Sequence, residues 1–274
     1  MKIYSLKSFL AVLVLGISAL SCTSSTPAVS NSNATTTGSP ASDSTAVSNS
    51  NVGQRVTIES ADKTVIVGSF LESAKPNTPA LLLLHQFGSD RHSYDEFAKR
   101  LQAKGFGVLA IDGRGFGEST KTSDGKNVAV SRSDEAVKGM NADVAAAFEY
   151  LSRQKNVDPA RIGIVGASYG SSLALIYGAK NPKVKAVALL SPGLDYFGNM
   201  PTEPAVKSYG DRPLLLVAAD DDAESADSVK KLKAAGNNDK YEVKIYDKGG
   251  HGTGLFKAKV GLEDLLEQFL IKSL

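Results

Sequence analysis

The sequence predicts an α/β fold, in which eight mostly parallel strands form one doubly wound sheet flanked by helices. Short apolar runs alternate along the chain with segments whose apolar residues have helical spacing. Most of these runs are apolar at nearly every position, which is typical of parallel strands covered on both faces. Since no internal repeat breaks the alternation, we expect one layered domain over residues 54–274.

The eight strands are expected in order along the chain. The first two are split by Ala61-Asp62-Lys63 and predict an N-terminal hairpin, because a short polar segment separates two β-rich runs. Most of the other six have the pattern of buried strands. The expected ranges are 55–60, 64–71, 80–85, 107–112, 161–166, 184–191, 213–220 and 241–247.

Helices are expected between and after these strands. The first begins with a capping box of Ser93 and Glu96, in which each side chain satisfies a free backbone N–H. Gly236 follows the end of the fourth. Because only residues 192–212 separate the sixth strand from the seventh, we expect no cap domain. The expected helices are 93–104, 134–154, 168–180, 224–235 and 260–270.

Residues 1–21 have the layout of a secretory signal peptide. Lys2 and Lys7 precede the apolar run 9–20, and small residues follow up to Cys22. That run is too short for a comfortable permanent membrane span. Cys22 is the only cysteine, so no disulfide can form within the chain.

The stretch ALSC, residues 19–22, resembles the lipobox of bacterial lipoproteins, with Ala19 where leucine is usual. The resemblance implies that Cys22 is lipidated, and that the protein is exported and anchored through this lipid to a membrane of a bacterial cell envelope. The alternative is a secreted protein with a leftover cysteine. Residues 22–53 contain no aromatic residue and almost no charge, which predicts a disordered tether or an O-glycosylated stalk.

The charge balance excludes one class of function. The formal net charge is +2, and the 31 basic residues include Lys2 and Lys7 of the leader, so the mature chain balances its 29 acidic residues. Proteins that bind nucleic acid carry a basic patch that neutralises phosphates. We therefore expect no nucleic-acid partner.

The segment GASYG places a candidate nucleophile, Ser168, between an expected strand and an expected helix. A serine at such a turn needs strained backbone dihedrals to expose its hydroxyl. Side chains two positions away on either side would collide with the adjoining strand and helix. Gly166 and Gly170 avoid these collisions, so the pattern predicts a nucleophile elbow.

A serine nucleophile requires a base, and the chain has three histidines. His251 lies in the loop GGHGTG after the last expected strand, beyond a strand's carboxyl end. The simpler alternative is a surface loop histidine. His85 ends a strand and His92 precedes a helix, and both are better explained structurally.

A carboxylate must orient the base, and three aspartates follow the strand 213–220. Strand geometry alone does not choose among Asp220, Asp221 and Asp222. A solvated turn or a helix N-cap explains at least two of them.

Three segments together resemble the α/β-hydrolase superfamily, and within it the dienelactone-hydrolase-like serine esterases. They are LLLLHQFGSDR (81–91), IDGRGFGES (111–119) and VDPARIGIVGASYG (157–170), and the resemblance covers residues 55 to 272. It implies Asp222 as the acid, with Asp220 as the second choice, in the chain order Ser168, Asp222, His251. Dienelactone hydrolases themselves use cysteine as nucleophile, whereas this chain has serine.

The resemblance also implies an oxyanion hole formed by the backbone N–H groups of Phe87 and Tyr169. Gln86 stands where many relatives have glycine. We therefore expect its side chain to crowd or line the hole as a substrate-binding group. Walls of an acyl pocket are expected among Phe116, Tyr169, Tyr196 and Phe197, unless these aromatics belong to the core.

The predicted activity is cleavage of small carboxylic esters, or related acyl compounds, through an acyl-enzyme on Ser168. No metal and no organic cofactor are implied. The alternatives are an acyltransferase or a peptidase with the same triad, and a catalytically silent binding lipoprotein of the envelope.

Overall fold

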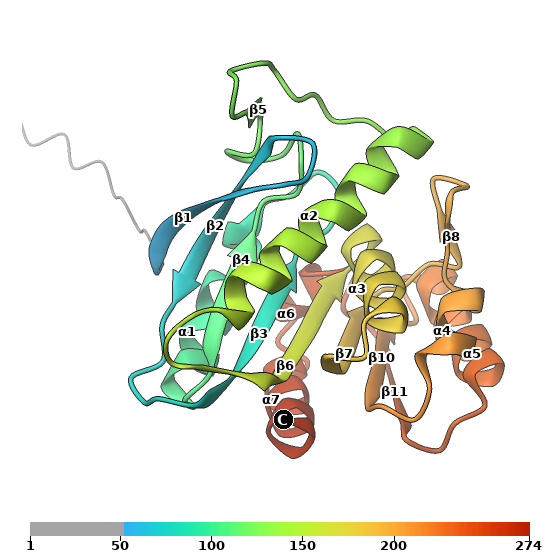
Figure 1. Ribbon diagram of the computed structural model, residues 1–274. Coiled ribbons are helices and arrows are strands. Elements are labelled where there is room, and N and C mark those ends of the chain that lie inside the picture. Colours follow the sequence, from blue (N-terminus) through green and yellow to red (C-terminus); the bar gives the residue numbers. More distant parts are fainter. Residues whose placement is uncertain (1–51) are drawn as a thin grey trace, which may run out of the picture. The chain divides into compact units, whose positions relative to one another are not determined.

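The computed structural model describes residues 52–274, and it confirms the predicted fold class. The predicted signal peptide, Cys22 and nearly all of the predicted tether lie outside this range. Eight strands follow one another across the sheet in the order β1-β2-β4-β3-β6-β7-β10-β11, and β5 pairs with β2 (Figure 1). Their bounds are β1 Gln54–Glu59, β2 Thr64–Leu71, β3 Thr78–Leu84, β4 Gly107–Ile111, β5 Lys121–Thr122, β6 Val157–Ala167, β7 Val184–Leu190, β10 Leu214–Ala219 and β11 Tyr241–Tyr246.

Strand direction and register gather several loops at one edge of the sheet. β1, β2 and β4 pair antiparallel, and every neighbouring pair from β4 to β11 is parallel. Leu84 at the end of β3 lies opposite Ile111 of β4 and Gly166 of β6. Ligands of open α/β sheets bind beyond such carboxyl ends. A site built from these loops is therefore expected at this edge.

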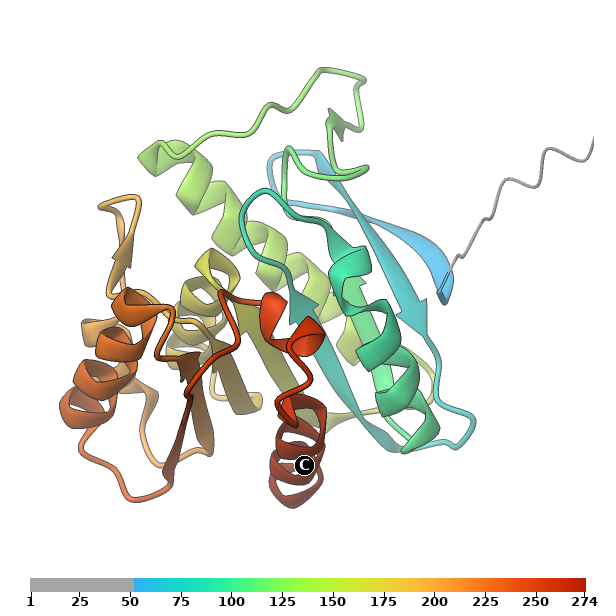
Figure 2. The same ribbon diagram turned by 180° about the vertical axis from the view of Figure 1, so that it is seen from behind.

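Helices cover both faces of the sheet. α2, α3, α4 and α5 lie on the face toward the viewer in Figure 1, and α1, α6 and α7 lie on the opposite face, which Figure 2 brings to the front. Their bounds are α1 Asp95–Ala103, α2 Asp134–Ser152, α3 Tyr169–Lys180, α4 Glu203–Tyr209, α5 Ala223–Gly236, α6 Gly254–Lys257 and α7 Leu262–Ser273.

Each face of the sheet has its own apolar core, and β3 shows why the strands are apolar at every position. Leu82 and Leu84 point into the core under α2 and α3, whereas Leu81 and Leu83 point into the core under α1 and α7. All four side chains are buried. Burying one leucine side chain stabilises a fold by about 2 kcal/mol, so both faces contribute to stability.

The predicted start of the first helix is wrong. A 3-10 turn, η1 Arg91–Tyr94, precedes α1, and its cap is Asp90, whose side chain accepts a hydrogen bond from the His92 N–H. Ser93 instead donates its hydroxyl proton to the Asp90 carbonyl. The extra turn moves the cap upstream, so Ser93 and Glu96 do not form a capping box.

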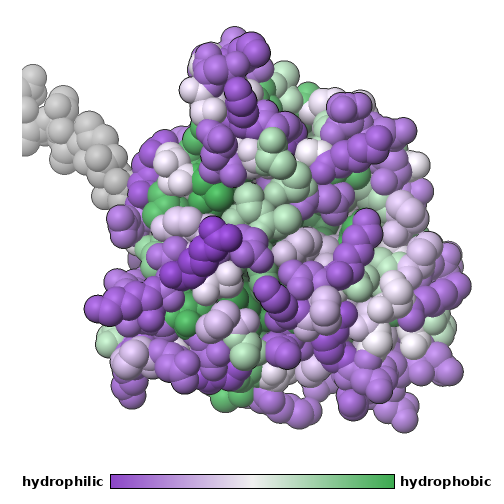
Figure 3. Space-filling view, viewed as in Figure 1, coloured by the Kyte–Doolittle hydropathy of each residue, from purple (hydrophilic) through white to green (hydrophobic). Residues whose placement is uncertain are grey.

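The connection between β7 and β10 contains only a small hairpin and α4, in keeping with the expected lack of a cap domain. The hairpin pairs β8 Asp195–Tyr196 with β9 Met200–Pro201. Over the described range, three large apolar side chains are exposed, Val130, Val243 and Ile271. The surface on the α2 side is mostly hydrophilic (Figure 3). Among the helices of residues 52–274, none has the length and apolar character needed to cross a membrane.

Candidate active site

Ser168 occupies the sharp turn between β6 and α3. Its backbone has φ +54° and ψ −125°, outside the regions that residues with a Cβ usually adopt. A Cβ at Gly166 would lie 2.2 Å from the Gly170 carbonyl oxygen, and one at Gly170 would lie 2.6 Å from the carbonyl oxygens of Leu84 and His85. The two glycines therefore allow β6, α3 and the end of β3 to close around the serine, as the motif predicts.

The structure brings Ser168, His251 and Asp222 together in one hydrogen-bonded line. Ser168 Oγ lies 2.7 Å from His251 Nε2, and His251 Nδ1 lies 2.7 Å from Asp222 Oδ2. Because a carboxylate only accepts hydrogen bonds, Nδ1 carries the proton and Nε2 is left to accept from the serine. Ser168 itself is buried, with 5% of its surface exposed, whereas the side chain of His251 is 42% exposed.

The three consecutive aspartates have different positions. Asp222 contacts the histidine and, although it stands at the N-cap of α5, makes no side-chain cap hydrogen bond. Asp221 accepts from the backbone N–H groups of Gly249 and Gly250, and these bonds lower the pKa of its carboxyl. Asp220 is exposed at the end of β10, and its side chain bonds to no described residue. The geometry thus selects Asp222 over Asp220 as the partner of His251.

Among the backbone N–H groups of the loops at this edge of the sheet, two that could donate to a ligand have no acceptor among residues 52–274. One belongs to Tyr169, the first residue of α3, and the other to Phe87 in the loop after β3. A helix N-terminus carries a partial positive charge and favours an anion. These are the two donors that the resemblance implies for the oxyanion hole.

His85 fixes the direction of the Phe87 N–H. Its Nδ1 lies 2.7 Å from the carbonyl oxygen of Gln86, which belongs to the same peptide unit as the Phe87 N–H. In a trans peptide the two groups point in opposite directions, so holding the carbonyl aims the N–H. His85 Nε2 accepts from the Gly113 N–H at 2.8 Å, which places the ring proton on Nδ1. Burial lowers the pKa of His85, so the ring is neutral.

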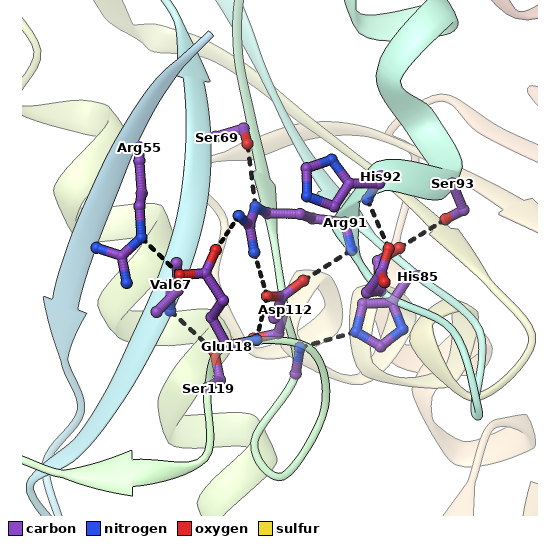
Figure 4. A network of polar contacts seen from close by, with 12 residues as sticks. Arg55, Val67, Ser69, His85, Arg91, His92, Ser93, Asp112, Glu118 and Ser119 are labelled. Atoms are coloured by element: carbon purple, nitrogen blue, oxygen red, sulfur yellow. Dashed lines mark hydrogen bonds and ion pairs between the residues drawn. The ribbon is translucent and has the colours of Figure 1, made fainter. Parts of the chain in front are cut away.

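A buried ionic network ties the loop after β3 to the loop after β4 (Figure 4). Arg91 donates its backbone N–H to Asp112 Oδ1 at 2.8 Å, forms an ion pair with the same carboxylate, and bonds Ser69 Oγ at 3.1 Å. Hydrogen bonds from Arg91, and then from Arg55, lower the pKa of Glu118. The network therefore anchors the end of the loop that carries Phe87 to the loop after β4 and to β2.

Gln86 lies in the loop after β3, and its side chain contacts the loop that carries His251. Its Oε1 accepts two hydrogen bonds from Thr253, from the backbone N–H at 2.7 Å and from the hydroxyl at 3.0 Å. These contacts engage only the oxygen of the carboxamide, so the expectation that Gln86 lines the hole stays a prediction. The sequence gives no sign of this partner, which lies 167 positions away.

The aromatic residues expected as pocket walls belong to the apolar core under α2 and α3 or pack against it, which is the alternative that the sequence left open. These residues are Phe116, Tyr169, Tyr196 and Phe197. Together with Phe87 they form six contacting pairs of rings, whose centroids lie 5.0 to 6.3 Å apart. Phe116 and Tyr169 are buried, and Phe197 is partly exposed. Arg132, which the motifs did not single out, lies with its guanidinium 4.4 Å from the Phe87 ring centre. Arg132 lies between β5 and α2, where the sequence has neither the helical nor the strand pattern that would have indicated its position.

Comparison with known proteins agrees with this architecture. A family model described as alpha/beta hydrolase fold matches residues 79–205. An uncharacterised protein of Mycobacterium tuberculosis is 28% identical over 81% of this chain and 80% of its own. The structure of an esterase of Pyrococcus furiosus is similar with a TM-score of 0.66 at 18% identity, over 80% of this chain and 92% of that one. A dienelactone hydrolase of Anabaena variabilis gives 0.61 at 18% identity, over 81% and 99%.

Proposed function

We propose that this chain, which has the α/β-hydrolase fold, is a serine hydrolase that cleaves small carboxylic esters or related acyl compounds. One observation carries the proposal. The hydroxyl of Ser168, the imidazole of His251 and the carboxylate of Asp222 form a continuous line of hydrogen bonds at the carboxyl edge of the sheet. A nucleophile, a base and a group that orients the base are the minimum set for acyl transfer.

The reaction follows from these positions. His251 Nε2 accepts the hydroxyl proton while Ser168 Oγ attacks the ester carbonyl, and Asp222 stabilises the resulting imidazolium. The N–H groups of Phe87 and Tyr169 donate to the tetrahedral oxyanion. The imidazolium then gives its proton to the departing alkoxide, which leaves an acyl-enzyme on Ser168. A water molecule, deprotonated by His251, attacks this ester and releases the acid.

The short connection between β7 and β10 supports a preference for small or surface-presented esters. Lipases that are activated at an interface close their site with a lid, and this connection holds only a small hairpin and α4 of seven residues. We therefore expect no sharp rise in rate when a substrate passes its critical micelle concentration. Such a rise would contradict an open site.

The test combines an active-site probe with a panel of chromogenic esters from acetyl to long-chain. We expect a fluorophosphonate to label the wild type, and Ser168→Ala to abolish labelling and lower kcat/KM by at least about four orders of magnitude. Ser172→Ala is the matched control, because Ser172 lies in α3, the helix that follows Ser168. Its side chain is buried, and its hydroxyl has no described hydrogen-bond partner. A wild type that neither labels nor hydrolyses any member of the panel would make the chain a binding protein.

We also propose that the protein is held at a membrane of a bacterial envelope by a lipid on Cys22. The support is the sequence alone: the apolar leader, the ALSC stretch and the polar segment that follows. Cells fed a fatty-acid analogue should incorporate it into the wild type and not into Cys22→Ser. If the two proteins were labelled equally, or if the wild type were not labelled, the proposal would be wrong. The alternative, a secreted protein, would then be favoured.

A further inference from the structure

The loop that carries His251 is positioned by side chains from other strands. Residues 249–253 make backbone hydrogen bonds only with residues of the same segment, up to 256. No strand among the described residues pairs with this loop. Loops of this kind need side-chain partners for their N–H groups. Whatever supplies those partners sets the place of the base.

Three strand ends supply them. Asp221, after β10, accepts from the N–H groups of Gly249 and Gly250 at 3.1 and 3.0 Å. The buried Ser191, after β7, accepts from the Gly252 N–H at 2.9 Å through its hydroxyl. Gln86, after β3, accepts from Thr253. The N–H groups on both sides of His251 are thus all held by side chains.

Gln86 differs from the other two because it belongs to both halves of the site. Its backbone carbonyl, held by His85, shares a peptide unit with the Phe87 N–H. Its carboxamide oxygen holds both donors of Thr253, two residues after the base. The side chain of Gln86 also packs closely against Gly252. A Cβ at Gly252, whose φ is +59°, would lie only 2.2 Å from Gln86 Oε1. One residue therefore fixes the separation between the oxyanion donor and the base.

We propose that Gln86 is a positioning residue that couples the oxyanion loop to the base loop. The inference rests on the proposed function and adds a role for a residue that the chemistry does not use. Because the contact joins two parts of the chain and neither Gln86 nor Thr253 is a reacting group, its loss should lower kcat and leave KM nearly unchanged. Displacing a reacting group by about 1 Å can cost about a hundredfold in rate.

The experiment compares two substitutions of nearly equal size. Gln86→Met removes the acceptor and should lower kcat for an activated acetyl ester by about 10- to 100-fold, with KM within about threefold of wild type. Gln86→Glu keeps an oxygen in the same place and should recover most of the loss. Thr253→Val should lower kcat in the same direction, and adding it to Gln86→Met should have little further effect, because both remove one contact.

Gln102→Met is the matched control, since Gln102 lies on α1 and its side chain bonds only the Glu72 carbonyl. Full activity in Gln86→Met, equal losses in Gln86→Met and Gln86→Glu, or a raised KM with kcat unchanged would each overturn the inference. The last result would instead indicate that Gln86 binds substrate, as the sequence analysis expects. If Gln86→Met does not fold, Thr253→Val alone tests the inference. A lower kcat with KM nearly unchanged would support it, and an unchanged kcat would contradict it. A wild type without esterase activity would instead overturn the proposed function.

Discussion

The backbone at Ser168 is strained, and its neighbours hold it in that state. A left-handed φ costs a residue with a Cβ about 1 to 2 kcal/mol. The Ser168 N–H donates to the Leu190 carbonyl at 2.8 Å, and its carbonyl accepts from Ser171. These contacts fix both ends of the strained residue. The strained conformation places the hydroxyl at the end of β6, where it contacts His251.

The acid of the proposed triad can be tested by a substitution that keeps its shape. In Asp222→Asn an amide replaces the carboxylate that now accepts from His251 Nδ1. The amide can donate to Nδ1, which stabilises the wrong tautomer and puts the proton on Nε2. We expect kcat to fall by about 10³- to 10⁴-fold with little change in the midpoint of thermal unfolding.

Asp220→Asn is the control, because Asp220 is exposed and bonds no described side chain. Its kcat should stay within about twofold of wild type. Comparable losses from both substitutions in the same ester assay would mean that the contact seen at Asp222 does not decide the activity.

Single residues were predictable where the chain marks them locally. Ser168 is flanked by two glycines, and His251 lies in a glycine-rich loop, so short motifs were enough to propose them. The partner of Gln86 was not predictable, because Thr253 comes near it only after β3 and β11 have taken their places in the sheet. Arg132 was missed for the same reason, since only folding brings it onto Phe87.

Among the elements, strands and long helices were predictable, and the shortest elements were not. Most of the eight main strands are near-continuous apolar runs, because helices cover both faces of the sheet, whereas β1 and β11 at its edges carry polar residues. β5, β8 and β9 have two residues each and α6 has four, too few to show a period. The cap of α1 was misplaced because a 3-10 turn intervenes, which apolar spacing does not reveal.

The packing of α3 against β3 predicts an unusual sign for one substitution. Alanine in place of a helical glycine normally stabilises a protein by about 1 kcal/mol. At Gly170, in the first turn of α3, a Cβ would lie 2.6 Å from two backbone carbonyl oxygens, which cannot swing away as a side chain could. The clash outweighs the propensity, so Gly170→Ala should lower the free energy of unfolding by about 1 to 3 kcal/mol and should reduce labelling of Ser168.

Gly254→Ala provides the comparison, since the nearest atom to a Cβ there is 3.7 Å away. Its free energy of unfolding should be equal to that of wild type or slightly higher. Both values come from urea unfolding. A Gly170→Ala protein as stable as Gly254→Ala would mean that β3 and α3 do not approach each other as closely as the structure has them.

At the scale of the whole molecule, the parallel part of the sheet assembles the site. Each of five neighbouring parallel strands ends in a group that acts there or positions one that does, and the register puts these ends on one edge. The groups after β3, β6, β7, β10 and β11 are Gln86 with Phe87, Ser168 with Tyr169, Ser191, Asp221 with Asp222, and His251. The site therefore depends on the register of all five strands.

Since the loops at this edge are joined through His85, the stability of the molecule should depend on pH in a specific window. Burial lowers the pKa of His85, whereas in the unfolded chain the ring titrates near its ordinary value of about 6.5. Below that pH the unfolded state binds a proton that the native state does not, so the free energy of unfolding falls as pH falls. One such group contributes a slope of up to about 1.4 kcal/mol per pH unit, until the pH reaches the lowered pKa of the folded ring.

His85→Gln should remove this slope below pH 6.5, because the glutamine oxygen can accept from the Gly113 N–H as Nε2 does and has no proton to take up. Urea unfolding at half-unit steps of pH measures both proteins. Above pH 7.5 their curves should run parallel, since neither side chain titrates there in either state. If the slopes were equal below 6.5, the buried imidazole would be charging freely, and the Gly113 N–H would have lost its acceptor without cost to the fold.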